Sequence, residues 1–149
     1  MVDTLTLPKI ILWLKKIEIF EQLAVNELSA VAAVTEQVTF SENEQVINEG
    51  DAGDTLYLII EGEVVVLKRQ EDGQEVELDR MGAGDSFGEM ALFDDIPRSA
   101  TIRSVRPSRM LVLHKLEFKE IVNEYPQIAL GICKALSSRI RKLHSKMLA

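Results

Sequence analysis

Apolar residues recur at helical spacing in the first part of the chain. The series is Ile11, Leu14 and Ile17, and then Leu23, Leu28 and Val31; steps of three occur in each group and place apolar residues on one face of a helix. Pro8 suits the first turn of a helix, because its missing N–H has no partner there. Asn26 before Glu27 is typical of a second helix start. The pattern predicts helices over residues 8–34.

The last part of the chain has the same spacing. A short helix is predicted over residues 116–124, stopped near Pro126, and a longer helix follows it. The steps between apolar residues in the longer helix are 4, 4, 4, 3 and 4, which keeps one face apolar; the residues are Ile128, Ile132, Leu136, Ile140, Leu143 and Met147. We expect helices over residues 116–147, with a stripe that packs inward or against a second copy of the chain.

The middle of the chain, residues 36–115, has the pattern of short strands separated by turns. Seven of the eight glycines fall between Gly50 and Gly88, which gives a turn signal about every ten residues. Strand-like runs lie between and after these glycines, at 55–60, 63–68, 75–78, 100–105 and 110–114. Asp72-Gly73 between two of the runs indicates a hairpin. Short strands at this spacing are typical of a sandwich, a jelly roll or a small barrel.

Length and composition narrow the class of protein. The 149 residues fit one domain, 1–149, and a hydrophobic fraction of 46% is enough for a substantial core. Lys and Arg number 17 against 24 Asp and Glu, and the net charge of −7 disfavours a general nucleic-acid-binding protein. The single cysteine, Cys133, excludes an internal disulfide and favours a reducing cytoplasm. His114 and His144 lie far apart in sequence, so we expect no histidine-rich metal site.

The sequence predicts no membrane span. The longest apolar stretch near the N-terminus runs from Ile10 to Leu14, before Lys15 and Lys16 interrupt it. A signal peptide core is longer than this, and a spanning helix needs about 18 apolar residues in a row. We therefore expect a soluble chain in the cytoplasm.

Charge is distributed unevenly along the chain. Residues 36–79 hold 13 acids and only two bases, Lys68 and Arg69, for a net charge of −11. Residues 125–149 hold five bases and no acid. We interpret the acidic region as solvated strand faces and turns, and the basic region as the wet face of an amphipathic helix. Contact of the basic region with nucleic acid or an anionic surface is the alternative.

One segment, residues 84–101, departs from ordinary strand-and-turn sequence. A short helix is predicted from Gly88 to Phe93, and the start of a helix offers unpaired N–H groups to an anion. Gly88 also lets a ligand approach the backbone closely. The guanidinium of Arg98 is a planar fork that matches two phosphate oxygens. The hydroxyl of Ser99, with the N–H groups of Ser99 and Ala100, would complete an anion site.

Glu89 sits within this segment and needs a different partner. A carboxylate beside a phosphate repels it, so Glu89 fits better as an acceptor for a neutral hydroxyl such as a ribose 2′-OH. The segment thus predicts a ligand with one phosphate charge and a sugar hydroxyl close together. Two structural interpretations stay open: Ser86 and Glu89 fit a capping box, and Arg98 has the acids Glu89, Asp94 and Asp95 nearby in sequence as ion-pair partners.

The residues now described carry a resemblance to a known family. Phe87-Gly-Glu-Met-Ala-Leu-Phe, followed by Pro97-Arg-Ser-Ala-Thr, resembles the phosphate-binding cassette of cyclic nucleotide-binding domains. Other segments are similar to the entry helix, the glycine-punctuated strands and the helix after the barrel; they are residues 19–23, 46–51, 54–64 and 118–126. The resemblance covers about residues 17 to 145, nearly the whole chain.

The resemblance implies an α+β fold, an antiparallel eight-stranded, jelly-roll-like β-roll with helices before and after it. It implies a non-catalytic module that binds a cyclic nucleotide and transmits occupancy through its C-terminal helix. Glu89 would take the ribose 2′-hydroxyl and Arg98 the cyclic phosphate, with Arg139 on a lid helix. The site residues it assigns are Phe87, Gly88, Glu89, Met90, Ala91, Arg98, Ser99, Ala100 and Arg139.

Two places in the sequence bear on which nucleotide base would be bound. Some cGMP-selective members of the family have Thr after the cassette arginine, where this chain has Ser99, which favours cAMP over cGMP. Some relatives close over the base with hydroxyl groups of the lid. Here Leu143 and His144 occupy the comparable turn.

Several alternative functions are weighed against nucleotide sensing. A cassette-bearing interaction or oligomerisation domain would keep the fold and bind no nucleotide. A regulatory domain excerpted from a larger transporter, channel or signalling protein would have a linked effector. A metal-dependent jelly-roll enzyme needs a ligand cluster that His114 and His144 do not supply. DNA-binding relatives append a helix-turn-helix after the last helix. The sequence ends at Ala149, so we expect no nucleic-acid binding by this chain alone. A homodimer through the last helix is a further hypothesis.

Overall fold

The computed structural model describes residues 4–148. The chain divides into two compact units: Thr35–Leu116 form one, and the residues through Val34 together with those from Glu117 onward form the other. The second unit contains the helices at both ends of the chain, which are α1 (Leu7–Leu14), the 3-10 helix η1 (Glu18–Phe20), α2 (Val25–Ala32), most of α3 (Lys115–Glu124) and α4 (Gln127–Leu148).

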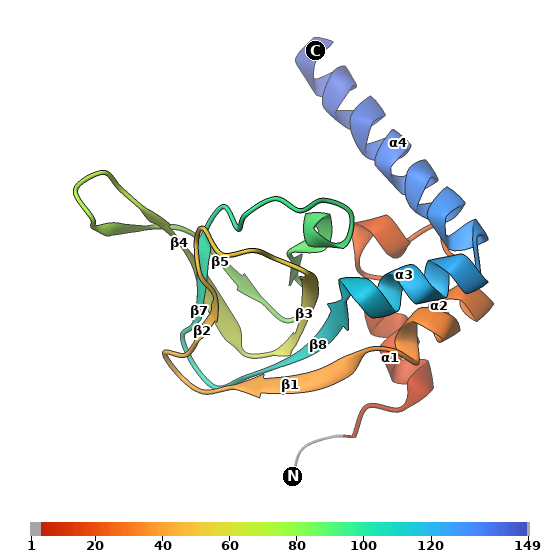
Figure 1. Cartoon of the computed structure of the whole chain (residues 1–149), viewed down its shortest axis with the longest axis horizontal. Coiled ribbons are helices and arrows are strands. Elements are labelled where there is room, and N and C mark those ends of the chain that lie inside the picture. The colour runs from red at the N-terminus through yellow and green to blue at the C-terminus, as the bar shows by residue number, and fades with distance from the viewer. Residues whose placement is uncertain (1–3, 149) are drawn as a thin grey trace. The chain divides into compact units, whose positions relative to one another are not determined.

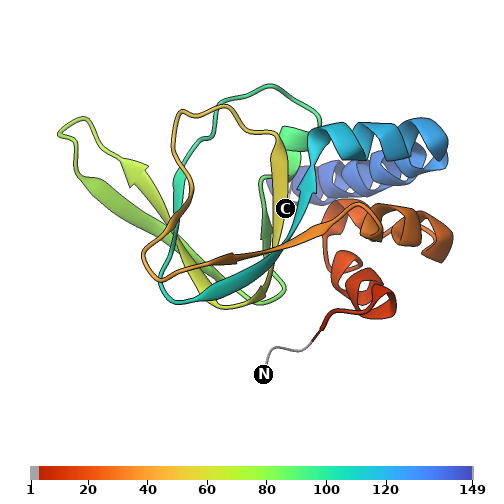
Figure 2. The same cartoon turned by 60° about the horizontal axis from the view of Figure 1, so that its bottom comes forward.

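The first unit is a β-roll of two four-stranded sheets (Figures 1 and 2). One sheet has the order β1-β8-β3-β6 and the other β2-β7-β4-β5, and every pairing is antiparallel. The strands are β1 (Glu36–Phe40), β2 (Gln45–Ile47), β3 (Thr55–Glu61), β4 (Glu63–Arg69), β5 (Glu75–Gly82), β6 (Ser86–Phe87), β7 (Thr101–Ser104) and β8 (Ser108–His114). The predicted antiparallel eight-stranded roll with helices before and after it is confirmed.

Both sheets contribute side chains to the core of the roll. Six residues form its buried cluster, drawn from six strands: Ile47, Ile59, Val64, Phe87, Ile102 and Met110. Residues 55–60 of β3 are buried or half-buried on both faces of the strand, which explains why its sequence is a nearly continuous apolar run. The core therefore fixes β3 and β6, which together carry the residues on either side of Gly88.

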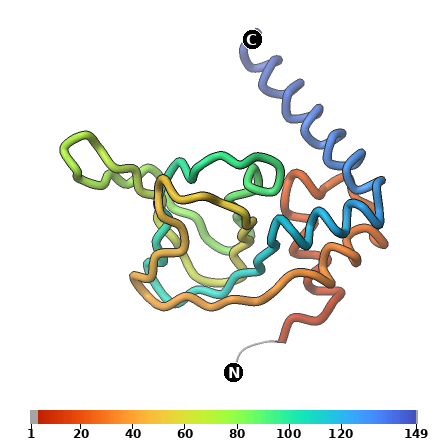
Figure 3. Tube along the Cα trace, viewed as in Figure 1, coloured from red at the N-terminus to blue at the C-terminus, as the bar shows by residue number. Residues whose placement is uncertain are grey.

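The β4–β5 hairpin extends beyond the rest of the roll (Figure 3). The predicted turn at Asp72-Gly73 is confirmed, with Gly73 at φ +85° and its N–H donating to the Gln70 carbonyl at 2.9 Å. The strand after the turn is longer than predicted, since it continues to Gly82, and its residues 75–80 are all exposed. Pairing with β4 supports the extra length, although the side chains are not buried.

The helical unit differs in two ways from the sequence-based expectation. Helix α2 begins one residue before Asn26, at Val25, and the Ala24 N–H donates to the Glu27 carboxylate at 2.8 Å. The apolar stripe of α4 is buried only in its first half. Ile128 and Ile132 are buried, whereas Ile140, Leu143 and Met147 are 65%, 55% and 83% exposed. Among residues 4–148, no helix is both long and apolar enough to cross a membrane.

Gly62, in the tight turn between β3 and β4, generates a stability prediction. Its φ is +108°, and a Cβ there would lie 2.1 Å from Ser108 Oγ and 2.6 Å from Ser108 Cα. Gly62→Ala therefore combines a left-handed backbone penalty with overpacking and is expected to lower the free energy of unfolding by about 2–4 kcal/mol. Gly73→Ala is the matched control, since Gly73 has φ +85° and nothing within 4 Å, and should cost about 1 kcal/mol. Urea unfolding measures both; equal losses would contradict the packing argument.

Candidate functional site

The segment predicted to carry chemistry connects β6 to β7. Gly88 follows β6 with φ +82°, a left-handed conformation that glycine adopts readily. The predicted short helix is present as the 3-10 helix η2 (Glu89–Leu92), with Gly88 as its N-cap and the Ala91 N–H donating to the Gly88 carbonyl at 3.1 Å. Because the cap position is a glycine, the capping-box interpretation with Ser86 as the cap is wrong.

A cavity of about 310 Å³ lies against this segment, a volume at the lower end of the usual range for ligand sites. Six of the nine predicted site residues line it, together with Ile96 and Pro97: they are Gly88, Glu89, Met90, Ala91, Arg98 and Ser99. Glu89 and Arg98 therefore border one hollow, as the sequence predicts, rather than pointing to separate surfaces.

The other three predicted residues have different surroundings. Phe87 is buried in the core of the roll and stacks on Tyr57, with ring centroids 5.0 Å apart. Ala100 directly follows Ser99 and is half-buried outside the cavity lining. Arg139 belongs to the helical unit, where its Nε lies 2.5 Å from Glu18 Oε1.

Main-chain hydrogen bonds hold Arg98 in place. Its N–H donates to the Asp51 carbonyl at 2.8 Å, and its carbonyl accepts from the Gly50 N–H at 2.8 Å. A bridge between Ala52 and Pro97 continues this pairing, so the segment before β7 runs beside the β2–β3 connection. The position of Arg98 is therefore set by the backbone of the roll.

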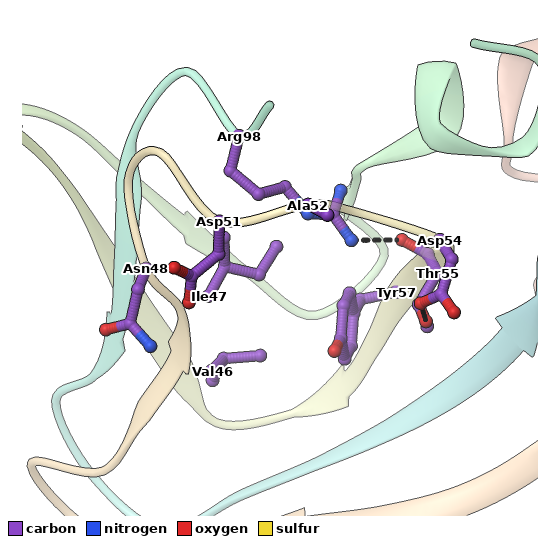
Figure 4. A pocket seen from close by; sticks show the side chains of 9 residues that line it. All are labelled: Val46, Ile47, Asn48, Asp51, Ala52, Asp54, Thr55, Tyr57 and Arg98. Carbon is purple, nitrogen blue, oxygen red and sulfur yellow. Dashed lines mark hydrogen bonds between the residues drawn. The ribbon is translucent and has the colours of Figure 1, made fainter. Parts of the chain in front are cut away.

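The guanidinium of Arg98 is directed by one further bond. Its Nη2 donates to the Thr55 carbonyl at 2.9 Å, at the start of β3 (Figure 4). Within residues 4–148 Arg98 has no ion-pair partner, and Asp95 instead contacts Lys115 at 2.5 Å. The interpretation of Arg98 as a structural ion-pair donor is wrong, because its polar partner is a neutral carbonyl. In the described residues, no carboxylate lies within ion-pair distance of this guanidinium, which borders the cavity.

Two glycines make room for this side chain. A Cβ on Gly53 would lie 2.2 Å from Arg98 Nε, and a Cβ on Gly88 would lie 2.7 Å from both Arg98 Nη1 and the Thr55 carbonyl. The glycine spacing along the chain predicts only a turn at Gly53. Its contact with Arg98 follows from the pairing of two segments far apart in sequence, and no local signal in the sequence indicates it.

A smaller cavity of about 120 Å³ lies where Arg98 meets the β2–β3 connection, lined by residues that include Asp51, Asp54 and Tyr57 (Figure 4). This volume is well below that of a nucleotide-sized site. Burial raises the pKa of the Tyr57 phenol, and the charge of Arg98 opposes that rise. In the described part of the chain, no group of three or more His, Cys, Asp or Glu residues is arranged to hold a metal ion.

Comparison with known proteins agrees with this geometry. The family model "Cyclic nucleotide-binding domain" matches residues 37–125. The chain belongs to the cyclic nucleotide-binding domain family. The matched domain is a regulatory binding domain and not a catalytic one, and both the family and the fold that the sequence resemblance implied are confirmed.

Three proteins similar to this cyclic nucleotide-binding domain are bacterial regulators. The chain is 33% identical over 124 residues to a CRP-like cAMP-activated global transcriptional regulator of Mycobacterium tuberculosis, covering 81% of this chain and 55% of that protein. It is similar to the N-terminal domain of a transcriptional regulator from Streptomyces coelicolor, with TM-score 0.83 and 30% identity over 92% of this chain and 96% of that one. It also resembles the catabolite activator protein of Thermus thermophilus, with TM-score 0.71 and 27% identity over 88% and 62%. The chain spans about half the length of the curated relatives it matches.

The electrostatic link between Arg98 and Tyr57 gives a pH prediction. Burial disfavours the phenolate and so raises the pKa of Tyr57, whereas the charge of Arg98 favours the phenolate and lowers that pKa. Removing the arginine charge removes the lowering effect. We expect Arg98→Met to raise the pKa of Tyr57 further, as measured by ultraviolet absorbance titration. Tyr57→Phe identifies which of the two tyrosines gives the signal, and circular dichroism checks that the fold persists at each pH. An unchanged or lower Tyr57 pKa would contradict this orientation of Arg98.

Proposed function

We propose that this chain binds a cyclic nucleoside monophosphate in the cavity beside η2. The observation that carries the proposal is the guanidinium of Arg98, which is fixed by a hydrogen bond to a neutral carbonyl and borders the same cavity as Glu89. Arg98 binds the cyclic phosphate, since a guanidinium presents paired donors to two phosphate oxygens. Glu89, which lines the same cavity, accepts the ribose 2′-hydroxyl.

The remaining predicted residues have supporting roles in this proposal. Gly88, Met90 and Ala91 line the ligand through the backbone, while Ser99 and Ala100 offer a hydroxyl and N–H groups to the phosphate. Phe87 holds Gly88 in position from within the core, where it stacks on Tyr57. The resemblance assigns Arg139 to a lid helix; in the helical unit it forms a partly exposed pair with Glu18, and exposed pairs of this kind are weak.

We infer that cAMP is the preferred nucleotide. Ser99 stands where some cGMP-selective members of the family have Thr, and the Mycobacterium tuberculosis relative is described as cAMP-activated. Titration with both cAMP and cGMP tests this inference directly.

We propose that the domain acts as a cytoplasmic sensor whose occupancy is transmitted through α4. A ligand shifts a conformational equilibrium only by its differential affinity for the two states. The output passes to a linked effector domain or to a second copy of the chain. A cassette-bearing interaction domain that binds no nucleotide is the second candidate, favoured by the exposed apolar residues of α4.

The Arg98 assignment predicts a loss of affinity. An arginine–phosphate bond contributes about 1.5–3 kcal/mol, so Arg98→Ala should weaken cAMP binding at least about tenfold in isothermal titration calorimetry. Arg80→Ala is the matched control, because Arg80 is an arginine of the same roll whose charge is paired with Glu77 and Glu63. Its cAMP affinity should match that of the unmodified protein.

Two results would decide against the proposal. Unchanged affinity in a folded Arg98→Ala protein would remove Arg98 from the phosphate site. Absence of a thermal shift of the unmodified protein with either nucleotide would favour the interaction domain, because a ligand of the native state raises its stability.

We further propose that α4 mediates a homodimer. Its second half carries Ile140, Leu143 and Met147 on one exposed stripe, and burial of such a face against an identical helix is favourable. Light scattering at high protein concentration, with and without cAMP, should give twice the monomer mass, and Leu143→Glu should return the monomer. A monomer under both conditions in the unmodified protein would exclude the dimer.

A further inference from the structure

Lys68, on β4, contacts the backbone next to Arg98. Its Nζ donates to the Ser99 carbonyl at 2.7 Å and lies 3.3 Å from Glu49 Oε2. Lys68 thus links three segments of the roll. It lies on β4, pairs with Glu49 of the β2–β3 connection, and donates to Ser99 of the segment before β7. Neither residue belongs to the cavity lining.

Glu49 is itself held from two directions. Its Oε1 accepts the Arg69 N–H at 2.9 Å, and its own N–H donates to Thr101 Oγ1 at 3.0 Å. These bonds fix the carboxylate in front of Lys68. The Arg69 N–H, followed by Lys68, lowers the pKa of Glu49, which keeps the carboxylate ionised at neutral pH.

The orientation of the Ser99 carbonyl decides where the next N–H points. In a planar trans peptide the C=O of one residue and the N–H of the following residue point in opposite directions. With the Ser99 carbonyl held by Lys68, the Ala100 N–H points away from β4. The Arg98 carbonyl, held by Gly50, orients the Ser99 N–H in the same way. Neither N–H has a protein acceptor within residues 4–148.

We propose that Glu49 and Lys68, the Glu49–Lys68 clamp, are positioning residues for nucleotide binding. The clamp fixes the Ser99–Ala100 peptide, which begins at the cavity-lining residue Ser99, so that its N–H is available to the phosphate. Neither clamp residue lines the cavity. This inference rests on the proposed function, and it adds two residues from outside the cassette to the determinants of affinity.

The direction in which affinity changes when Glu49 is replaced distinguishes a positioning role from a simple effect of charge. Removing the negative charge of Glu49 near an anionic ligand should tighten binding if charge alone matters. The clamp requires the opposite, since loss of Glu49 releases Lys68 and with it the Ser99 carbonyl. Direct binding of phosphate by Lys68 would also leave a Glu49 variant unimpaired, because the lysine would remain available.

The experiment measures cAMP affinity by calorimetry for the unmodified chain and for Glu49→Met, Glu49→Gln, Lys68→Met and Lys68→Arg. We expect Glu49→Met and Lys68→Met to weaken binding about fivefold to tenfold, and the double variant to weaken it no further. Lys68→Arg should restore affinity to within about twofold, because arginine can make the same bond. Glu75→Met, which removes an acid paired with Arg103 in the same sheet, is the control for lost charge and should not weaken binding.

Nuclear magnetic resonance gives a readout that a general loss of stability would not move. The Ala100 amide signal should shift in Lys68→Met and Glu49→Met and stay in place in Glu75→Met, while thermal unfolding identifies any variant that fails to fold. If Glu49→Met does not fold, Glu49→Gln, which keeps an acceptor for Arg69, replaces it. Unchanged or tighter binding in the folded Glu49 and Lys68 variants overturns the clamp alone. Failure of the unmodified protein to bind either nucleotide overturns the proposed function and the clamp with it.

Discussion

The hydrogen bond from Arg98 to the Thr55 carbonyl is the constraint on which the candidate site depends. A guanidinium has five N–H donors, so one donor can fix its direction while the others stay available. Because the acceptor is neutral, the bond orients the side chain and leaves its charge intact. The close approach of Gly53 and Gly88 makes this geometry possible, and the core of the roll holds both segments in register.

The negative charge of the surrounding roll also affects which anions Arg98 can attract. Residues 36–79 carry a net charge of −11, so the general field of this region opposes anions. A single oriented cation overcomes that field only at short range, where hydrogen bonds add to the charge attraction. An anion that lacks the matching hydrogen-bond pattern gains little there. In the proposed site, the same acidity that disfavours phosphate in general would therefore contribute to selectivity for one phosphate-bearing ligand.

The sequence predicts much of this fold because its signals are local. The apolar runs and the Asp72-Gly73 turn predict the hairpin and the neighbouring strands, and the cassette motif predicts that Glu89 and Arg98 share one cavity. The sequence does not predict contacts between distant segments. Gly53 meets Arg98 across 45 positions and Glu49 meets Lys68 across 19, and both contacts depend on strand register. The α4 stripe is continuous in sequence, yet only its first half is buried, because periodicity does not indicate what a face packs against.

Strand β5 lies at one edge of its sheet, with six consecutive exposed residues. An edge of this kind has free backbone donors and acceptors that can pair with a strand of another molecule. Here Glu75, Glu77 and Asp79 alternate with Val76 and Leu78, so each apolar position is flanked by carboxylates. Glu75 and Glu77 are also ion-paired, with Arg103 and Arg80, so two such edges brought together would have to accommodate charged side chains beside each apolar position. The alternation thus acts as a guard against fibrous self-association, and it lets the chain keep a long hairpin in water without covering it.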